Sequence, residues 1–106
     1  MTQLLTTIAQ VREHLAPARR QSSKIGCVPT MGALHSGHGA LIERARADAD
    51  IVVVTIFVNP IQFDRKEDYD RYAKNLDSDL RFCGIRGVDL VFAPSDAKRI
   101  KRLLGK

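Results

Sequence analysis

The chain has 106 residues, which is enough for one small domain with a single hydrophobic core. Hydrophobic residues make up 44% of it and charged residues 27%, and these ordinary proportions argue against a disordered or fibrous protein. The formal net charge is +5, but residues 1–97 carry twelve basic and twelve acidic side chains, so the whole excess lies in residues 98–106. Because a nucleic-acid-binding protein spreads its positive charge over a face, no nucleic-acid partner is expected.

The sequence also argues against a membrane or secreted protein. The longest apolar run, 51–58, has eight residues, whereas a membrane span needs ~20. The N-terminal residues lack the basic region and cleavage site of a secretory signal, so we expect a cytoplasmic location and no membrane partner. Cys27 and Cys83 show no metal-type spacing and are expected to be buried free thiols.

The first two elements are an expected helix and an expected strand. Ile8, Val11 and Leu15 recur at helical spacing, which predicts an amphipathic helix that Pro17 ends. Residues 25–28 form a short apolar run closed by a proline, which predicts the first strand.

A second amphipathic helix is expected to begin at Ser36 or Gly37, with Ser36 as its N-cap. Its apolar positions are Leu41, Ile42, Ala45 and Ala49. Residues 51–58 then read IVVVTIFV without alternation, which is typical of a central parallel strand covered by helices on both faces.

The last elements follow a charged stretch. Residues 64–68 are expected to be a solvated charge run, and the acidic and basic stretch 65–74 precedes a helix that Asn75 caps and that Gly84 or Gly87 ends. The apolar positions of that helix are Leu76, Leu80 and Cys83. Residues 88–93, closed by a proline, predict the third strand.

This order of elements predicts an α/β fold. We expect a Rossmann-like half domain with a three-stranded parallel sheet and flanking helices, in the order βαβαβ after an N-terminal helix. This partial nucleotide-binding domain would span residues 1–95, and residues 96–106 would form a basic tail able to pack as a short helix. Ligands of such sheets bind at the carboxyl ends of the strands, where the loops 29–38 and 59–63 both fall. An incomplete sheet leaves an open edge, so we also expect self-association into a homodimer.

The first loop, PTMGALHSGH, has the composition of a phosphate-binding turn. Gly32 and Gly37 permit unusual backbone angles and the close approach of a ligand. His35 and His38 lie near the expected start of a helix, where free N–H groups and the helix dipole favour a phosphate. The alternatives are two solvent-facing histidines beside turn glycines, or a zinc site with Cys27 that lacks a fourth ligand. We expect no metal ligands from the protein and magnesium only as the companion of ATP.

The second loop, FVNPIQF, places Asn59 and Gln62 directly after the central strand. Their amides can bind a small hydroxy acid without adding charge to a site that receives a triphosphate. The alternative is that Asn59 only ends the strand and Gln62 only faces solvent.

Three motifs, PTMGALHSGH, VVVTIFVNPIQFDRKEDYDRY and GVDLVFAPS, extend over most of residues 25–95. Together they resemble the pantothenate synthetase family, the pantoate:beta-alanine ligases of coenzyme A biosynthesis, within the HxGH nucleotidyltransferase superfamily. The resemblance implies that ATP and pantoate form a pantoyl adenylate with release of pyrophosphate. Beta-alanine then displaces AMP to give pantothenate.

The resemblance also implies roles for individual residues. His38 would be the catalytic proton donor, and His35 would contact the phosphates beside it. Gln62 would bind pantoate and beta-alanine, supported by Asn59 and bordered by Tyr72. The residues expected to line the ATP site are Met31, Gly32, Ala33, Leu34, His35, Ser36, Gly37 and His38.

Two departures from the family pattern limit these expectations. Tyr72 is followed by Ala-Lys where the family usually has Pro-Arg, and the family's Lys/Asp/Gln group and Ser-Ser-Arg loop are not in this sequence. We therefore expect little or no ligase activity from these 106 residues by themselves. A non-catalytic module that binds nucleotide or pantoate and a related nucleotidylyltransferase remain as alternatives.

Overall fold

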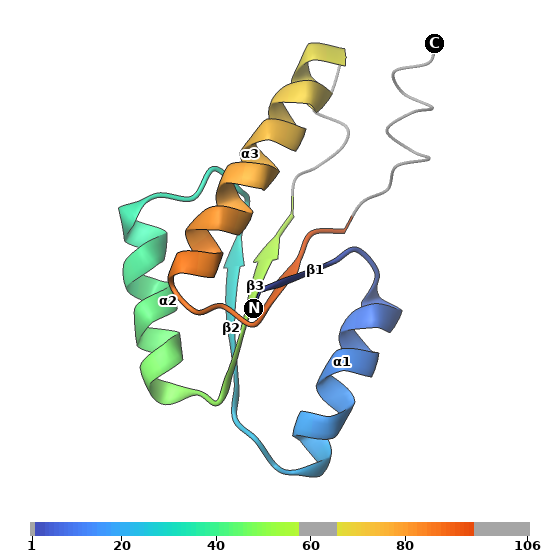
Figure 1. The fold of residues 1–106 in the computed structure, drawn as a ribbon, viewed down its shortest axis with the longest axis vertical. Coiled ribbons are helices and arrows are strands. Elements are labelled where there is room, and N and C mark those ends of the chain that lie inside the picture. The colour runs from blue at the N-terminus through green and yellow to red at the C-terminus, as the bar shows by residue number, and fades with distance from the viewer. Residues whose placement is uncertain (1, 58–65, 95–106) are drawn as a thin grey trace.

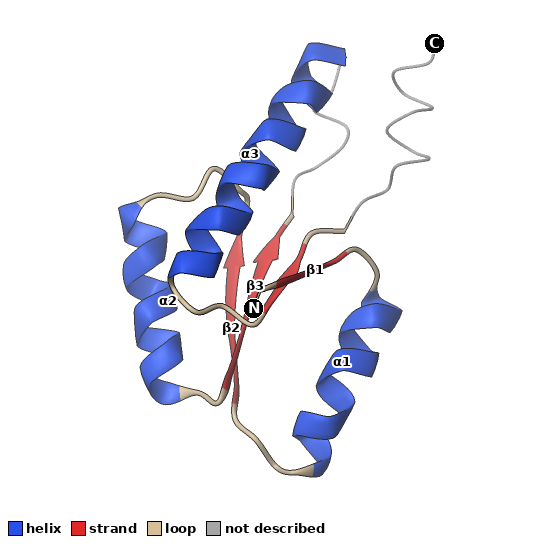
Figure 2. Ribbon diagram, in the orientation of Figure 1, coloured by secondary structure: helices blue, strands red, loops and turns tan. Residues whose placement is uncertain are grey.

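The computed structural model describes residues 2–57 and 66–94, which form a mixed α/β fold around one parallel sheet (Figures 1 and 2). The strands are β1 (Gln3–Leu5), β2 (Ile25–Thr30), β3 (Ile51–Ile56) and β4 (Leu90–Phe92). The helices are α1 (Ile8–Arg20), α2 (Ser36–Asp48) and α3 (Lys66–Ile85). The strand order is β1-β4-β3-β2, and every neighbouring pair is parallel. The predicted α/β class and parallel sheet are confirmed, but the sheet has four strands where three were expected.

The core is divided between the two faces of the sheet, as the uninterrupted apolar run of β3 predicts. Val52 and Val54 face one side, where they pack in a cluster with Ile42 of α2 and Cys83 of α3. Val53 faces the other side and packs in a cluster with Leu15 of α1 and with residues of β1 and β4. Figure 1 shows α2 and α3 together on one side of the sheet and α1 on the other. Helices on both faces explain why β3 has no polar alternation.

Strand β1 is the element that the sequence did not reveal. It has three residues and buries only Leu5, so its pattern is too short to distinguish from the approach to α1. Its partner is remote in sequence, because Leu4 pairs with Val91. The backbone N–H of Ala93 also donates to the Leu5 carbonyl at 3.0 Å. Long-range pairing therefore creates this strand.

Two prolines that were expected to end elements lie inside them instead. Pro17 is within α1, which continues to Arg20. Pro29 is within β2, which is an edge strand of the described sheet, and an edge strand can accommodate a residue without an N–H.

Helix α3 begins nine residues before the expected cap at Asn75, so the charged stretch after residue 65 is helical and Asn75 lies in the helix interior. The helix ends at Ile85, and Gly87 follows in a left-handed conformation with φ of 75°. Gly87 therefore ends the helix as predicted, because glycine adopts the left-handed backbone that follows the last turn. No helix of the described ranges is long and apolar enough to cross a membrane.

Cys27 was expected to be buried but is exposed, whereas Cys83 is buried as expected, and both thiols are free. Cys27 pairs in register with Val53, so its side chain points to the α1 face. The buried cluster on that face comes from α1, β1, β3 and β4, and β2 adds a partly buried Ile25 at its start. The exposure of Cys27 thus follows from the position of β2 at the edge.

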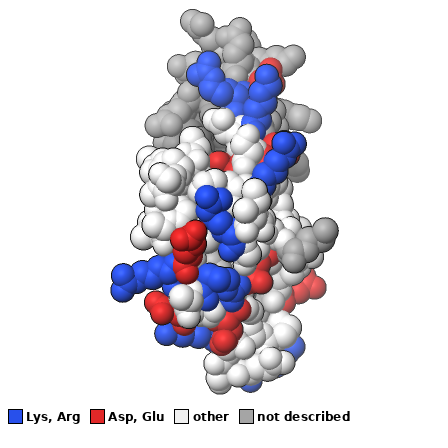
Figure 3. Space-filling model, turned by 60° about the vertical axis from the view of Figure 1, so that its left-hand side comes forward, with Lys and Arg blue, Asp and Glu red and all other residues white. Residues whose placement is uncertain are grey.

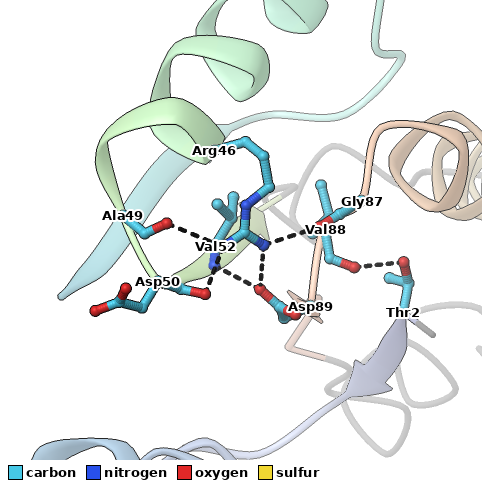
Figure 4. Close-up of polar contacts among 8 residues, drawn as sticks. All are labelled: Thr2, Arg46, Ala49, Asp50, Val52, Gly87, Val88 and Asp89. Atoms are coloured by element: carbon cyan, nitrogen blue, oxygen red, sulfur yellow. Dashed lines mark hydrogen bonds and ion pairs between the residues drawn. The ribbon is translucent and has the colours of Figure 1, made fainter. Parts of the chain in front are cut away.

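A cluster of polar contacts joins the end of α2 to the amino ends of β3 and β4 (Figure 4). The Arg46 guanidinium donates to the Asp89 carboxylate at 2.8 Å and to the carbonyls of Gly87, Ala49 and Asp50. The same carboxylate accepts the N–H of Val52 at 2.8 Å. These contacts fasten α2 to the amino ends of β3 and β4. Elsewhere on the face of α2 and α3, acidic and basic side chains are interspersed (Figure 3).

Candidate functional site

The candidate site is the turn between β2 and α2, at the carboxyl end of the sheet. The turn begins at Thr30, whose hydroxyl donates to the Thr55 carbonyl at 2.9 Å and so ties the end of β2 to β3. Gly32 has φ of 93° and Ala33 has φ of 54°, so two consecutive residues are left-handed. The expected role of Gly32 in an unusual backbone angle is confirmed, and the strain extends to a non-glycine residue.

The turn is attached to α3 by a buried carboxylate. Asp79 is 4% exposed, and its two oxygens accept the N–H groups of Ala33 at 3.0 Å and Leu34 at 2.8 Å. Asp79 belongs to no motif of the sequence, although its position on the helix is one signal. Asp79 lies three residues after Leu76 and four before Cys83, which places a carboxylate on the apolar stripe of its helix.

The two histidines form the N-terminal cap of α2. The N-cap is His35, not Ser36 as expected, and Ser36 is the first helical residue. The Nδ1 atom of His35 accepts the N–H of Gly37 at 3.1 Å, and the Nδ1 atom of His38 accepts the N–H of His35 at 3.2 Å. The two rings lie with centroids 4.1 Å apart. The expected proximity of His35 and His38 at a helix N-terminus is therefore present.

Gly37 is required by this cap rather than by its backbone angle, since its φ is not among the positive values. A Cβ atom there would lie 2.9 Å from Cε1 of His35 and 3.2 Å from its Nδ1. Any side chain at this position would displace the capping imidazole. The absence of a side chain also leaves the backbone of the first helical turn accessible.

The capping bonds determine which nitrogen of each neutral imidazole carries the proton. Because Nδ1 accepts a backbone N–H in both His35 and His38, the proton of each neutral ring is on Nε2. Both Nε2–H groups are thus hydrogen-bond donors beside the positive end of α2. This arrangement can bind an anion and can stabilise negative charge that develops on it.

The described residues supply only part of the predicted site. The turn brings together the proposed ATP-lining residues 31–38, of which Met31 is 81% exposed. Asn59 and Gln62 lie outside the described residues, and Tyr72 lies in α3 with a side chain that is not described. Within the described ranges, no three His, Cys, Asp or Glu side chains gather to hold a metal.

Burial of Cys83 behind the turn raises the pKa of its thiol to about 11. The Asp79 carboxylate, one helical turn away, raises it further, and Arg86 opposes the shift. The thiol therefore stays protonated near neutral pH and is a core group rather than a nucleophile.

A parallel α/β sheet with a glycine-containing turn, leading into a helix capped by the two histidines of an HxGH motif, places the chain in the class of Rossmann-like α/β proteins. The model of one family, pantoate-beta-alanine ligase, matches residues 3–102. The chain belongs to that family.

Relatives and solved structures agree with this assignment. The chain is 53% identical over 94 residues to the pantothenate synthetase of Aquifex aeolicus, a match that covers 89% of the chain and 33% of the relative. It is 51% identical over 90 residues to the pantothenate synthetase of Chromohalobacter salexigens, a match that covers 85% of the chain and 32% of the relative. The chain thus spans about a third of the length of these curated relatives.

Among solved structures, the pantothenate synthetase of Thermus thermophilus matches with a TM-score of 0.68 and 46% identity, covering 90% of this chain and 32% of that one. The pantoate-beta-alanine ligase of Francisella tularensis, complexed with beta-gamma ATP and beta-alanine, matches with a TM-score of 0.72 and 39% identity. This match covers 100% of this chain and 40% of that one.

Proposed function

We propose that this chain contributes the nucleotide-binding part of a ligase that condenses pantoate with beta-alanine at the expense of ATP. The observation that carries the proposal is the pair of Nε2–H donors at the N-terminus of α2, formed by His35 and His38. The family assignment supports the reaction, and the ligands named for the Francisella tularensis relative support ATP and beta-alanine as substrates.

In the proposed first step, the carboxylate of pantoate attacks the α-phosphorus of ATP and pyrophosphate leaves. Negative charge builds on the α-phosphate oxygens in the transition state, where donors fixed in advance lower the barrier. His35 and His38 supply such donors from one side, with orientations fixed by their capping bonds. In the second step, the amine of beta-alanine attacks the acyl carbon and AMP leaves, and His38 is the proposed proton donor.

Pantoate and beta-alanine are proposed to bind at Gln62, with Asn59 and Tyr72 beside them. Loop 59–63 follows β3, the immediate neighbour of β2 in the sheet, so its position in the chain supports a site next to the turn. Magnesium is proposed to arrive with the nucleotide. The carboxylate nearest the turn, that of Asp79, already accepts two N–H groups, which supports an ion held by phosphate oxygens and water.

The described residues provide donors on one side of the α-phosphate only. We therefore expect the 106-residue chain to bind MgATP and to form little pantothenate. A titration of the ¹⁵N-labelled chain tests this: MgATP should shift the amide signals of residues 31–38, and pantoate should shift that of Gln62. Shifts caused by phosphopantetheine and not by pantoate would instead favour a nucleotidylyltransferase, and no response to MgATP would contradict nucleotide binding.

Variants of His38 separate capping from phosphate binding. His38→Asn keeps an acceptor close to the position of Nδ1 and removes the Nε2–H donor, whereas His38→Gln keeps a donor close to Nε2. We expect the Asn variant to retain the helix, measured by circular dichroism, and to bind MgATP roughly ten-fold or more weakly, with the Gln variant less affected. Equal affinity of the Asn variant and the unmodified chain would contradict the proposed role of the imidazole.

The proposal extends to assembly, location and domain organisation. The open edge of β2 supports a homodimer, because outward-facing backbone groups are available to a second copy. The two free thiols are consistent with the reducing cytoplasm. Residues 1–95 are proposed to be the partial nucleotide-binding domain, and the proposed tail 96–106 lies outside the described residues.

A further inference from the structure

Asp79 is the one buried charged side chain among the described residues. Its carboxylate takes part in neither of the two ion pairs found there, which join Arg46 to Asp89 and Arg81 to Asp77. A buried carboxylate is unfavourable unless other groups replace its hydration. Here the replacement comes from two peptide groups, the N–H of Ala33 and the N–H of Leu34, each bonded to a different oxygen.

The shape of the turn explains how both N–H groups reach one carboxylate. Left-handed backbone at Gly32 and Ala33 turns consecutive N–H groups toward the same side, which creates a small anion-binding concavity. The protein fills this concavity with its own carboxylate. Consequently the amides of Ala33 and Leu34 are not free to bind phosphate. The groups available to bind it are the N–H groups at the start of α2 and the two imidazoles.

Leu34 directly precedes His35, the N-cap of α2. The carboxylate therefore fixes the backbone one residue before the imidazole whose Nδ1 begins the cap. Without this attachment, the strained pair at Gly32 and Ala33 would keep only the 3.4 Å bond from the Gly32 N–H to the Thr30 hydroxyl, and the entry angle of the chain into α2 would change. The position of both Nε2–H donors depends on that angle.

We propose that Asp79 is a positioning residue, which holds the turn before α2 so that His35 and His38 present their Nε2–H donors to the nucleotide phosphates. This inference rests on the proposed nucleotide-binding function of the turn. It adds a group from α3 that does not itself touch the nucleotide.

The first test uses the unmodified chain without nucleotide. NMR should detect couplings through the hydrogen bonds from the Ala33 and Leu34 amides to the side-chain carboxylate carbon of Asp79, together with slow exchange of both amide protons. If the couplings are absent and both amides exchange freely, the attachment is overturned, whether or not the chain binds nucleotide.

The second test compares Asp79→Asn with Asp77→Asn, an exposed carboxylate two residues away on the same helix. Asp79→Asn replaces one acceptor oxygen by an NH₂ group, so exchange at Ala33 or Leu34 should accelerate and the imidazole ¹⁵N shifts of His35 and His38 should move. Because displaced imidazoles would lose part of their charge-assisted hydrogen bonds to the phosphates, we expect MgATP to bind about ten- to a hundred-fold more weakly. Asp77→Asn should leave all three measurements unchanged.

The remaining outcomes also decide the question. Faster exchange at Ala33 and Leu34 with unchanged MgATP affinity and unchanged imidazole shifts would overturn the positioning role. If Asp79→Asn does not fold, Asp79→Glu keeps the charge while moving it by one methylene group, and it should weaken MgATP binding by a smaller factor. A folded Glu variant with full affinity for MgATP would overturn the proposal. Failure of the unmodified chain to bind MgATP would refute the proposed nucleotide-binding function. The hydrogen-bond couplings would then still decide whether Asp79 holds the turn.

Discussion

Cys83 lies in the core with no exposed surface, four residues after the carboxylate that holds the turn. Burial raises the pKa of its thiol from 9.0 to about 11, and the neighbouring Asp79 charge acts in the same direction. The folded chain therefore keeps a proton on this sulfur that the unfolded chain loses at lower pH. Folding stability becomes dependent on pH in the alkaline range.

The sign of this dependence follows from proton binding. Between pH 9 and pH 11 the folded state binds more protons at Cys83 than the unfolded state, so the free energy of unfolding falls as pH rises. In a Cys27→Ser chain, we expect ionisation of the Cys83 thiol to lower the free energy of unfolding by about 1 to 2 kcal/mol between about pH 9 and pH 10.5, measured by urea denaturation. A Cys27→Ser, Cys83→Val chain lacks the group and is the control. Parallel pH dependence of the two chains would contradict the raised pKa.

At the scale of elements, α1 and α3 end in the same way with different residues. After α1, the N–H of Ser22 donates to the Arg19 carbonyl and the N–H of Ser23 donates to the Ala18 carbonyl. After α3, Gly87 and Val88 make the equivalent bonds, to Gly84 and Cys83. Both are Schellman caps, in which the first residue past the cap is left-handed, with φ of 56° at Ser22 and 75° at Gly87. Only the second cap uses glycine, so Ser22 carries strain that Gly87 does not.

Substitution at these two caps should have opposite effects. Ser22→Gly removes the steric cost of left-handed backbone and should raise the free energy of unfolding by about 1 kcal/mol, measured by urea denaturation. Gly87→Ser should lower it by a similar amount, because a Cβ there meets only an ordinary contact of 3.8 Å and adds strain alone. Ser23→Gly is the control, since φ at Ser23 is not positive and glycine there only increases the freedom of the unfolded chain. A gain from Ser23→Gly that matched the one from Ser22→Gly would refute the cap argument.

The elements that sequence reasoning found and missed differ in where their stabilising contacts lie. The apolar run of β3 and the spacing of α2 are local patterns, and both predicted elements exist. Strand β1 depends on pairing with the remote strand β4, and Pro17 lies in a helix that packing extends past it. The site shows the same division, because the HxGH motif is visible in the sequence and the attachment to Asp79 is a tertiary contact.

At the scale of the whole molecule, the described sheet has one long open edge. The carbonyls of Lys24 and Thr30 accept N–H groups from residues 50, 51 and 57, at the two ends of β3, so alternate residues of β2 face β3 and the residues between them face outward. The outward set is Ile25, Cys27 and Pro29, of which Pro29 has no N–H to offer. A groove of about 370 Å³ runs between this edge and α2, where Arg44 and Asp48 lie among apolar residues.

This edge matches a second copy of itself when two chains meet antiparallel about a two-fold axis at Cys27. The Cys27 backbone groups then bond to each other, and each Ile25 N–H meets the Pro29 carbonyl of the other copy, so every outward donor of the strand is used. Because proline has no N–H, the carbonyl of Ile25 opposite it receives no bond from the partner strand and is left to water.

The arrangement predicts a specific cross-link. Directly opposed residues of a hydrogen-bonded antiparallel pair have Cα atoms about 5.5 Å apart, within the ~4.4 to 6.8 Å that a disulfide spans. Mild oxidation of the chain should therefore yield a covalent dimer, seen on non-reducing gels, and Cys27→Ser should abolish it. In the reduced chain, Cys27→Lys should shift the sedimentation equilibrium toward monomer by placing two positive charges at the axis, while Ala9→Lys on exposed α1 should not. A reduced chain that sediments as a monomer at all concentrations would show that the β2 edge does not pair two copies.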